Sequence, residues 1–126
     1  MSSYLRDTTL AFSADSTRLA VGSSDFTATI WDVETGTNVL TLPRDPAHGF
    51  RALAFSPDGR WLASGGTDCK VKVWDARTGA LLHTFRGHKG NVRRLKFVRL
   101  AEGLNLVSGS SDKTVKFWSL APLEKR

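Results

Sequence analysis

The sequence predicts an all-β protein built from three similar antiparallel sheets, and three observations carry that prediction. One stretch recurs at residues 18–32, 61–75 and 104–119. Trp31, Trp74 and Trp118 close the three copies and are separated by 43 and then 44 residues. Within the copies, apolar and polar residues alternate with the two-residue period of a strand. A repeat in the low forties made of short strands is typical of propeller blades.

Each repeat divides into short expected strands that are separated by turn residues. The first repeat has expected strands at residues 8–13, 18–22, 27–32 and 37–42, and the second at 51–56, 60–65, 70–75 and 80–85. Pro57 and Gly59 stand where a turn prefers them, and Gly36 and Gly79 supply a positive φ before the fourth strands. The third repeat has expected strands at residues 92–97, 105–109 and 114–119. A full fourth strand is not expected there, because Pro122 cannot donate a hydrogen bond to a neighbouring strand.

Length and composition fit one globular domain. The chain has 126 residues, of which 40% are hydrophobic and 24% charged. Its blades are expected at about residues 7–43, 48–86 and 87–120. No apolar run approaches the length of a membrane span, and the amino-terminal sequence lacks the apolar core of a signal peptide. Neither membrane insertion nor secretion is therefore indicated.

The cysteine and histidine content argues against a disulfide, a metal site or another cofactor. Cys69 is the only cysteine, which excludes an intrachain disulfide and a zinc site built from cysteines of this chain. The spacing of His48, His83 and His88 does not match a pair of metal ligands. We therefore expect no cofactor and a reducing intracellular compartment, the cytoplasm or the nucleus.

The net charge of +6 is confined to the last third of the chain. Residues 1–86 contain 9 Lys or Arg and 9 Asp or Glu, whereas residues 87–126 contain 9 and 3. Such asymmetry is typical of a surface that meets nucleic acid or an acidic protein. A solvated basic face with a charged tail is the other interpretation that the sequence leaves open.

Three in-phase copies of a tryptophan motif give the chain a resemblance to a known family. The motifs are Trp31-Asp32, Trp74-Asp75, the variant pair Trp118-Ser119, and Gly87-His88 before the third copy. Over about residues 7–119 the sequence resembles the WD-repeat β-propeller family. The resemblance implies four-stranded blades arranged about an axis, which present loops to partners.

In that family a hydrogen-bonded set of His, Ser or Thr, Asp and Trp ties a turn to the strands. The third repeat carries the whole set, which comprises His88, Ser108, Asp112 and Trp118. The second repeat carries Ser64, Asp68 and Trp74. However, His48 lies seven residues before Phe55, while His88 lies nine before Phe97, so the spacing does not assign His48 to the second set.

The first repeat is the least complete of the three. It has Asp25 and Trp31, but Val21 stands in place of the serine and no histidine precedes it. We therefore expect this blade to be held mainly by apolar packing of Leu10, Phe12, Leu19 and Ile30.

A hydrolase triad is an alternative interpretation of His88, Ser108 and Asp112. The chain has no Gly-x-Ser-x-Gly turn that would expose the serine as a nucleophile. Serine and aspartate also recur in the second repeat, as a structural period requires. We therefore expect no enzymatic activity.

The resemblance implies a contact surface on one rim of the ring. The rim positions carried over from the family are Thr8, Arg51 and Arg93, then Gly49 and Asn91, then Ser24, Thr67 and Ser111. Arg94 lies beside Arg93, and Lys89 is in the same loop, so the rim over the second and third repeats is expected to be cationic. Guanidinium groups bind carboxylate or phosphate in a bidentate manner, which favours an acidic or phosphorylated partner.

An open array of three blades leaves exposed faces and edges. We therefore expect a ring that is closed by another copy of the chain or by another polypeptide. The arm Ser2 to Leu5 is a candidate fourth strand for the third blade of another copy.

Three function classes follow, in this order of preference. The first is a non-catalytic protein-interaction scaffold within a larger assembly, and the second is an RNA-contacting subunit of a ribonucleoprotein complex. An enzyme is a distant third. Trp61 departs from the repeat because Arg18 and Asn105 stand at the matching positions, and it is either a partner anchor or packed against a neighbouring blade.

Overall fold

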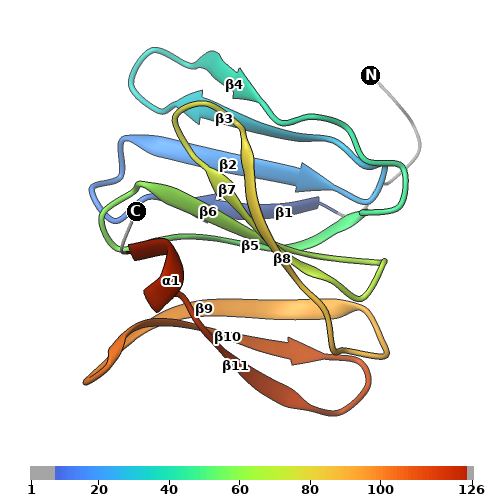
Figure 1. Cartoon of the computed structure of the whole chain (residues 1–126). Coiled ribbons are helices and arrows are strands. Elements are labelled where there is room, and N and C mark those ends of the chain that lie inside the picture. Colours follow the sequence, from blue (N-terminus) through green and yellow to red (C-terminus); the bar gives the residue numbers. More distant parts are fainter. Residues whose placement is uncertain (1–7, 125–126) are drawn as a thin grey trace.

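Three antiparallel sheets, called blades 1 to 3, follow one another along the chain in the computed structural model, which describes residues 8–124 (Figure 1). Blade 1 contains β1 (Thr8–Phe12), β2 (Arg18–Ser23), β3 (Ala28–Asp32) and β4 (Thr37–Thr41). Blade 2 contains β5 (Phe50–Phe55), β6 (Trp61–Gly66), β7 (Val71–Asp75) and β8 (Leu81–Phe85). Blade 3 contains β9 (Val92–Leu100), β10 (Gly103–Ser110) and β11 (Val115–Ser119). The expected all-β repeat fold is confirmed, with strands paired in sequence order in every blade.

Blade 3 has three strands because the chain turns into a short helix where the fourth strand would begin. This helix, α1 (Ala121–Glu124), follows β11 directly and includes Pro122. The missing fourth strand agrees with the expectation from the sequence. The hairpin of β9 and β10 is longer than expected, because pairing continues to Leu100 and Gly103.

The turns between first and second strands share one hydrogen-bonding scheme in blades 1 and 2. In blade 2 the Asp58 carboxylate accepts hydrogen bonds from the Ser56 hydroxyl and the Arg60 amide. Gly59 has a φ of 74° in this turn, and Ser16 has a φ of 63° in the corresponding turn of blade 1. A side chain at positive φ is strained, so glycine suits this position better than serine.

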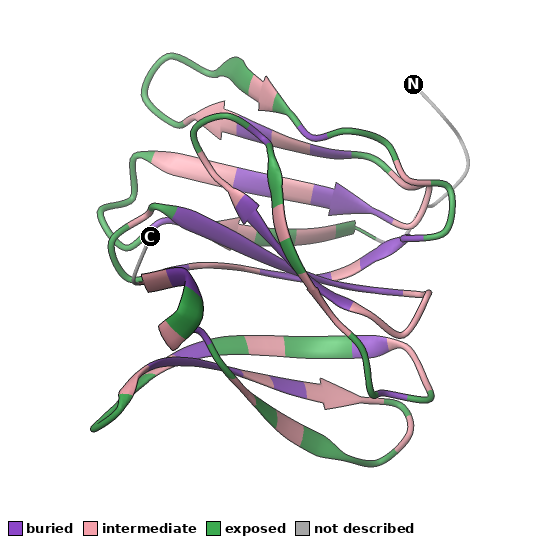
Figure 2. Ribbon diagram, in the orientation of Figure 1, coloured by how far each residue is buried: buried purple, intermediate pink, exposed green. Residues whose placement is uncertain are grey.

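Blade 2 lies between the other two blades, and each of its faces forms an apolar joint with one neighbour. The first joint contains Ala20, Ala28, Ile30 and Leu42 from blade 1, with Phe50, Leu53, Leu62 and Trp74 from blade 2. The second joint contains Trp61, Ala63, Val71 and Val73 from blade 2, with Val92, Phe97, Leu104, Leu106, Leu120 and Leu123 from the remainder of the chain. Because both faces of blade 2 are covered, its strands β6 and β7 carry the longest buried stretches (Figure 2).

Blades 1 and 3 each keep one face uncovered within residues 8–124. On blade 1, Leu10 and Phe12 are 59% and 58% exposed, so the expectation that they pack this blade was wrong. Ile30, which alternates to the other face, is 1% exposed in the first joint. On blade 3, Val115 and Phe117 are 65% and 63% exposed. Apolar side chains at strand positions are therefore buried only where a second blade covers them.

The candidate arm Ser2 to Leu5 lies outside the described residues. Within residues 8–124, α1 is the only helix, and it is far too short to cross a membrane.

Candidate functional site

A partly buried hydrogen-bond chain connects four side chains of blade 3 beneath one rim of the molecule. The Trp118 indole Nε1 donates to the Ser108 Oγ at 2.8 Å, and the Ser108 hydroxyl lies 2.7 Å from His88 Nε2. His88 Nδ1 lies 3.0 Å from Asp112 Oδ2. Because a carboxylate only accepts, Nδ1 carries a proton, and in a neutral ring Nε2 accepts from the serine hydroxyl. The Thr114 hydroxyl, which the sequence analysis did not single out, donates to Asp112.

Blade 2 contains the same chain, with His48 in the histidine position. His48 Nδ1 lies 2.7 Å from Asp68 Oδ1, and His48 Nε2 lies 2.9 Å from Ser64 Oγ. Trp74 Nε1 donates to the same Ser64 oxygen at 2.9 Å. The shorter spacing in the sequence therefore does not keep His48 out of this network.

The register of the strands explains how His48 reaches its place. Phe50 pairs with Gly66 in blade 2, and Val92 pairs with Ser110 in blade 3, so these two pairs are equivalent. His48 precedes Phe50 by two residues, whereas His88 precedes Val92 by four, because the loop at Lys89 and Gly90 has no counterpart in blade 2. The shorter loop also approaches closely: a Cβ on Gly49 would lie 3.0 Å from the Thr67 hydroxyl.

Blade 1 solves the same problem with another residue. Trp31 Nε1 donates to Thr29 Oγ1 at 2.8 Å. The Thr29 hydroxyl therefore takes the place of the serine hydroxyl, which is absent because Val21 stands at the serine position. Thr29 pairs with Val21 across β2 and β3, as Lys72 pairs with Ser64 in blade 2. A joint inspection of these paired positions in the sequence could have found Thr29.

Hydrogen bonds lower the pKa of both network aspartates. For Asp112 the largest causes are the bonds donated by the Thr114 hydroxyl and the Lys89 amide, which hold its pKa well below the usual range. For Asp68, burial raises the pKa, but the hydrogen bond and charge interaction with His48 outweigh it and leave a lowered pKa. Both carboxylates therefore stay ionised at neutral pH, where they stabilise the turns.

The triad-like order of Ser108, His88 and Asp112 has a structural use. The Ser108 side chain is fully buried, and its oxygen accepts the Trp118 indole hydrogen. Ser64 is equally buried and holds Trp74 in the same way. These hydroxyls tie tryptophan to the sheet and do not face a solvent-filled cleft.

Lys72 supplies a partly buried ion pair next to the blade 2 network. Its side chain is 6% exposed, and its Nζ binds Asp45 Oδ2. The ammonium also lies 6.0 Å from the centre of the Trp74 ring. Lys72 thus fixes the loop before β5, whereas the sequence pattern alone does not identify its acidic partner.

The rim above the networks is formed by the turns between second and third strands and by the starts of β5 and β9. Arg51 and Arg93 both occupy the extra residue of a β-bulge, between Phe50 and Ala52 in β5 and between Val92 and Arg94 in β9. A bulge redirects a side chain away from the alternation of its strand. Arg93 is exposed, whereas Arg51 is half-buried.

Thr8 does not share this position. It pairs with Ser23 at the start of β1, which is the register of Phe50 and Val92, and the described part of β1 has no bulge. The equivalence of Thr8 with the two arginines was therefore wrong. A strand start is poorly marked in a sequence because a bulge adds one residue without changing the turn that follows.

The other expected rim positions lie together at this end of the blades. The Thr67 amide donates to the Gly49 carbonyl, and the Ser111 amide donates to the Asn91 carbonyl, both at 2.9 Å. Ser24 follows Ser23 in the matching turn of blade 1.

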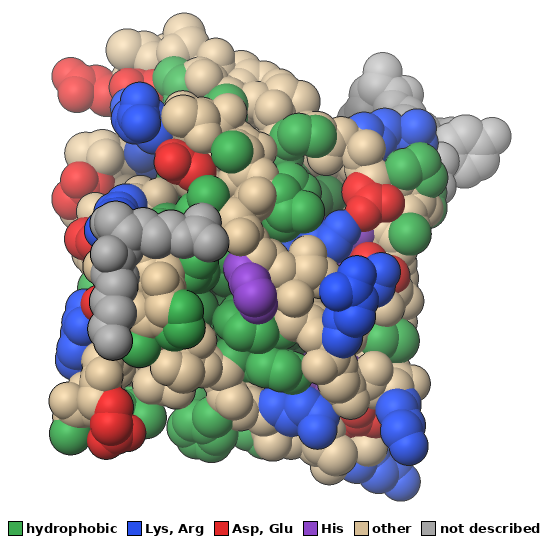
Figure 3. Space-filling model, viewed as in Figure 1, with side chains coloured by type: hydrophobic (Ala, Val, Ile, Leu, Met, Phe, Trp, Pro, Cys, Tyr) green, Lys and Arg blue, Asp and Glu red, His purple; other side chains and the backbone are tan. Residues whose placement is uncertain are grey.

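Exposed cations add to this rim over blade 3. Arg94 and Lys89 are exposed, as is Arg93 between them. In the space-filling view, Lys and Arg side chains gather toward the lower right, over the rim ends of blades 2 and 3 (Figure 3). Among residues 8–124, no group of three His, Cys, Asp or Glu side chains is arranged to hold a metal ion. This end of blades 2 and 3 therefore carries several exposed positive charges.

Repeated blades tied by His–Ser–Asp–Trp networks define a propeller-type repeat protein. The family model described as WD domain, G-beta repeat matches residues 8–32, 36–75 and 79–119. The chain belongs to the WD40 repeat family, whose members generally act as non-catalytic interaction scaffolds.

Among the solved structures that resemble the chain, two match it over nearly its whole length. One is described as the crystal structure of RRP9 WD40 repeats and the other as the structure of U3-55K. Each is 29% identical with a TM-score of 0.84, and the match covers 97% of this chain and 38% of the other. The computationally designed Ika4 protein is 35% identical with a TM-score of 0.72, over 86% of this chain and 62% of that one. No curated protein matches the chain significantly in sequence. The chain thus spans less than half the length of these first two structural neighbours.

Proposed function

We propose that this chain is a non-catalytic scaffold whose rim over blades 2 and 3 binds an acidic or phosphorylated protein segment. The observation that carries the proposal is the placement of Arg51 and Arg93 at the same bulge in neighbouring blades. Guanidinium groups at the same position of neighbouring blades, with Arg94 next to Arg93, suit a partner segment that carries several carboxylates or phosphates.

The surroundings of the exposed cations support this function. Arg93 and Arg94 make no ion pair within residues 8–124, so their charge is available to a partner. Charged groups on such a rim increase association rates and select partners more than they add affinity. We therefore expect binding that weakens as salt rises but does not disappear.

Fluorescence anisotropy with two labelled probes tests the rim. The probes are an octaglutamate peptide and a phosphoserine peptide of matched charge. Replacing Arg93 and Arg94 together by glutamate is expected to weaken binding at least tenfold. Arg77→Glu, at the opposite ends of the blades, is the matched control and should change little. If the double variant binds both probes as well as the unchanged protein, or if neither probe binds the unchanged protein, the rim proposal fails.

RNA is the second candidate, because the excess of positive charge lies entirely in residues 87–126. Arg93, Arg94, Lys96 and Arg99 are exposed along β9, where Arg99 is paired with Glu124. A labelled uridine decamer in the same assay distinguishes the two functions. Binding to phosphates releases counterions, so the logarithm of the RNA affinity would fall linearly and steeply with the logarithm of salt concentration. RNA binding that exceeds peptide binding at physiological salt would favour this second function.

We also infer that further blades cover the open faces of blades 1 and 3. At the first joint, the face of blade 2 that carries Trp74 packs on blade 1. At the second joint, the equivalent face of blade 3, which carries Leu106, packs on the opposite face of blade 2. Blade 1 exposes the first kind of face and blade 3 the second, so the two open faces are complementary in type. The added blades come from a second copy of the chain or from another polypeptide.

Sedimentation velocity tests this inference. A second copy would give a dimer or larger closed species at micromolar concentration, which should dissociate when Phe117 is replaced by serine. A stable, well-folded monomer that binds no hydrophobic dye at these faces would contradict the inference.

A further inference from the structure

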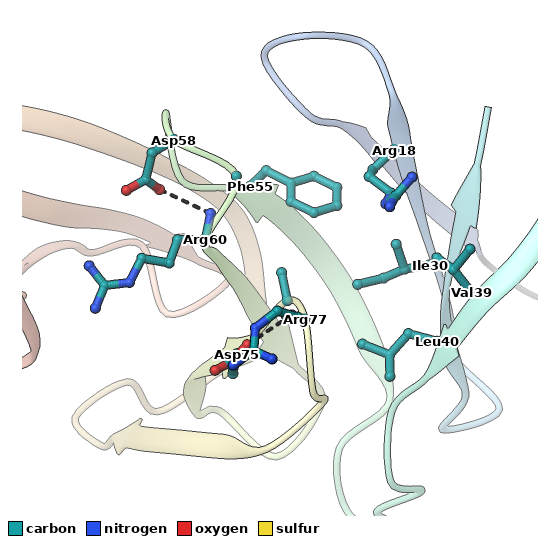
Figure 4. A pocket seen from close by; sticks show the side chains of 11 residues that line it. Arg18, Ile30, Val39, Leu40, Phe55, Asp58, Arg60, Asp75 and Arg77 are labelled. Carbon is teal, nitrogen blue, oxygen red and sulfur yellow. Dashed lines mark hydrogen bonds between the residues drawn. The ribbon is translucent and has the colours of Figure 1, made fainter. Parts of the chain in front are cut away.

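A groove opens between blades 1 and 2 at the ends of the blades opposite the rim. Its volume is about 580 Å³, within the range of pockets that hold ligands of moderate size. Ile30 and Leu40 from blade 1 and Phe55 from blade 2 converge on it, and Arg18 points toward the same space (Figure 4). Ala76 and Arg77 line it from the turn after β7. The groove therefore has an apolar floor with arginines at its edge.

The second joint shows why this space is open. Trp61 pairs with Asp75 as Arg18 pairs with Asp32, so Trp61 and Arg18 are equivalent. Trp61 is 5% exposed and fills the second joint, while Arg18 extends to Asp32 at 3.0 Å. The sequence therefore replaces a large apolar side chain by a charged one at the first joint.

A second pair of equivalent positions enlarges the difference. The Leu120 amide donates to the Leu104 carbonyl, as the Ala76 amide donates to the Arg60 carbonyl. Leu120 and Leu104 are buried in the second joint. At the first joint, the equivalent of Leu120 is Ala76, which is small, and the equivalent of Leu104 is Arg60. The Arg60 guanidinium lies over the Trp61 ring, 5.1 Å from its centre.

The segment at α1 shows what fits such a joint. Leu120 and Leu123 are 0% and 5% exposed against Trp61, and Glu124 follows them immediately. The Glu124 carboxylate accepts hydrogen bonds from the Leu104 amide at 2.9 Å and from Arg99 at 3.0 Å. The second joint is thus filled by a leucine pair that is fixed by one carboxylate.

We propose that the groove at the first joint is a docking site for a segment of a partner protein that carries the same chemistry. Two leucine-type side chains would enter the groove at the first joint, in the space that corresponds to the one filled by Leu120 and Leu123 at the second joint. Acidic residues next to them would bind Arg77. This surface is separate from the rim and does not depend on the proposed function there.

The charges at the groove favour an acidic segment. Arg77 is exposed, and its guanidinium makes no ion pair or hydrogen bond within residues 8–124. The two carboxylates at the groove, Asp58 and Asp75, already accept hydrogen bonds from amides of their own turns, including those of Arg60 and Arg77. Of the three arginines at the groove, Arg18 is paired with Asp32 and Arg60 lies over the Trp61 ring, whereas the Arg77 guanidinium contacts no carboxylate or ring within residues 8–124.

A synthetic peptide of sequence SLAPLEEE, which copies the start of the α1 segment and ends in glutamates, is the direct probe. Its matched controls are SAAPAEEE, which lacks the leucines, and SLAPLKKK, which reverses the charge. Ala76→Leu refills the groove as Leu120 fills the second joint, and Arg77→Glu reverses the edge charge. Arg93→Glu on the rim is the control variant. Fluorescence anisotropy of labelled peptides gives the dissociation constants, and thermal unfolding shows that each variant is folded.

The expected result is saturable binding of SLAPLEEE that falls at least tenfold with Ala76→Leu, with Arg77→Glu, and with either control peptide. Arg93→Glu should leave this binding unchanged, while it weakens octaglutamate binding if the rim proposal holds, so the two proposals fail separately. The groove proposal is overturned if SLAPLEEE does not bind below millimolar concentration, if SLAPLKKK binds as well, or if Ala76→Leu folds and still binds.

Discussion

Replacing Ser64 by alanine measures how much the buried network of blade 2 contributes to stability. The Ser64 oxygen lies at the centre of that network, 2.9 Å from Trp74 Nε1 and 2.9 Å from His48 Nε2. All three side chains are buried. Alanine removes the shared partner while it leaves the fold of the backbone and nearly the same volume.

The expected cost follows from the groups left behind. Two hydrogen bonds are lost, each with a net value of about 1 kcal/mol, and a buried donor and acceptor remain without partners. We therefore expect the free energy of unfolding to fall by about 2–4 kcal/mol. Ser111 is an exposed serine and offers a control. Ser111→Ala should change the free energy of unfolding by less than about 0.5 kcal/mol.

Urea unfolding followed by far-ultraviolet circular dichroism is the suitable assay, because tryptophan is itself varied in the next step. A double-mutant cycle of Ser64→Ala and Trp74→Phe isolates the bond between these two side chains, with an expected coupling of about 1 kcal/mol. A loss below about 1 kcal/mol for Ser64→Ala, together with no coupling in the cycle, would refute the view that this network holds the blade.

Three further predictions address charge, backbone strain and the open faces. The pKa of Asp68 is lower in the folded chain than its unfolded value near 3.9, so its contribution to stability is present above about pH 4 and is lost as pH falls through the folded value. Asp68→Asn should therefore flatten the dependence of unfolding free energy on pH between about pH 5 and 2, and an unchanged slope would contradict this. Ser16→Gly should stabilise the chain by about 0.5–1 kcal/mol and Gly59→Ser should destabilise it by a similar amount, since both positions have a positive φ; thermal unfolding midpoints that move in the same direction would refute the strain argument. Phe117→Ser should change the intrinsic unfolding free energy by less than about 0.5 kcal/mol, because the side chain is 63% exposed; a large loss in dilute, monomeric protein would show that this face is already covered.

The site was less predictable than the fold, and His48 and Thr8 show why. The sequence does not assign His48 to the network, because its distance from Phe55 differs from that of His88 from Phe97, although the loop, not the strand, accounts for the difference. The sequence spacing matches Thr8 with Arg51 and Arg93, although β1 lacks their bulge. Loop length and bulges change spacing locally, and only the cross-strand register reveals which residues are equivalent.

The sequence by itself determined the number of blades, the strands within them and their turns. These features have local causes that are present in each repeat: the alternation of apolar residues, the turn residues, and the tryptophan at the end of each copy. The absence of a fourth strand after Trp118 was also readable, because Pro122 acts locally.

Only the tertiary structure decided which apolar positions are buried and where a groove opens. Leu10 and Ile30 are both apolar strand residues of blade 1, yet one is 59% exposed and the other 1% exposed. Likewise Trp61 fills one joint, whereas Arg18 at the equivalent position leaves the other open. Burial is a property of two surfaces in contact, and a strand pattern specifies only one of them.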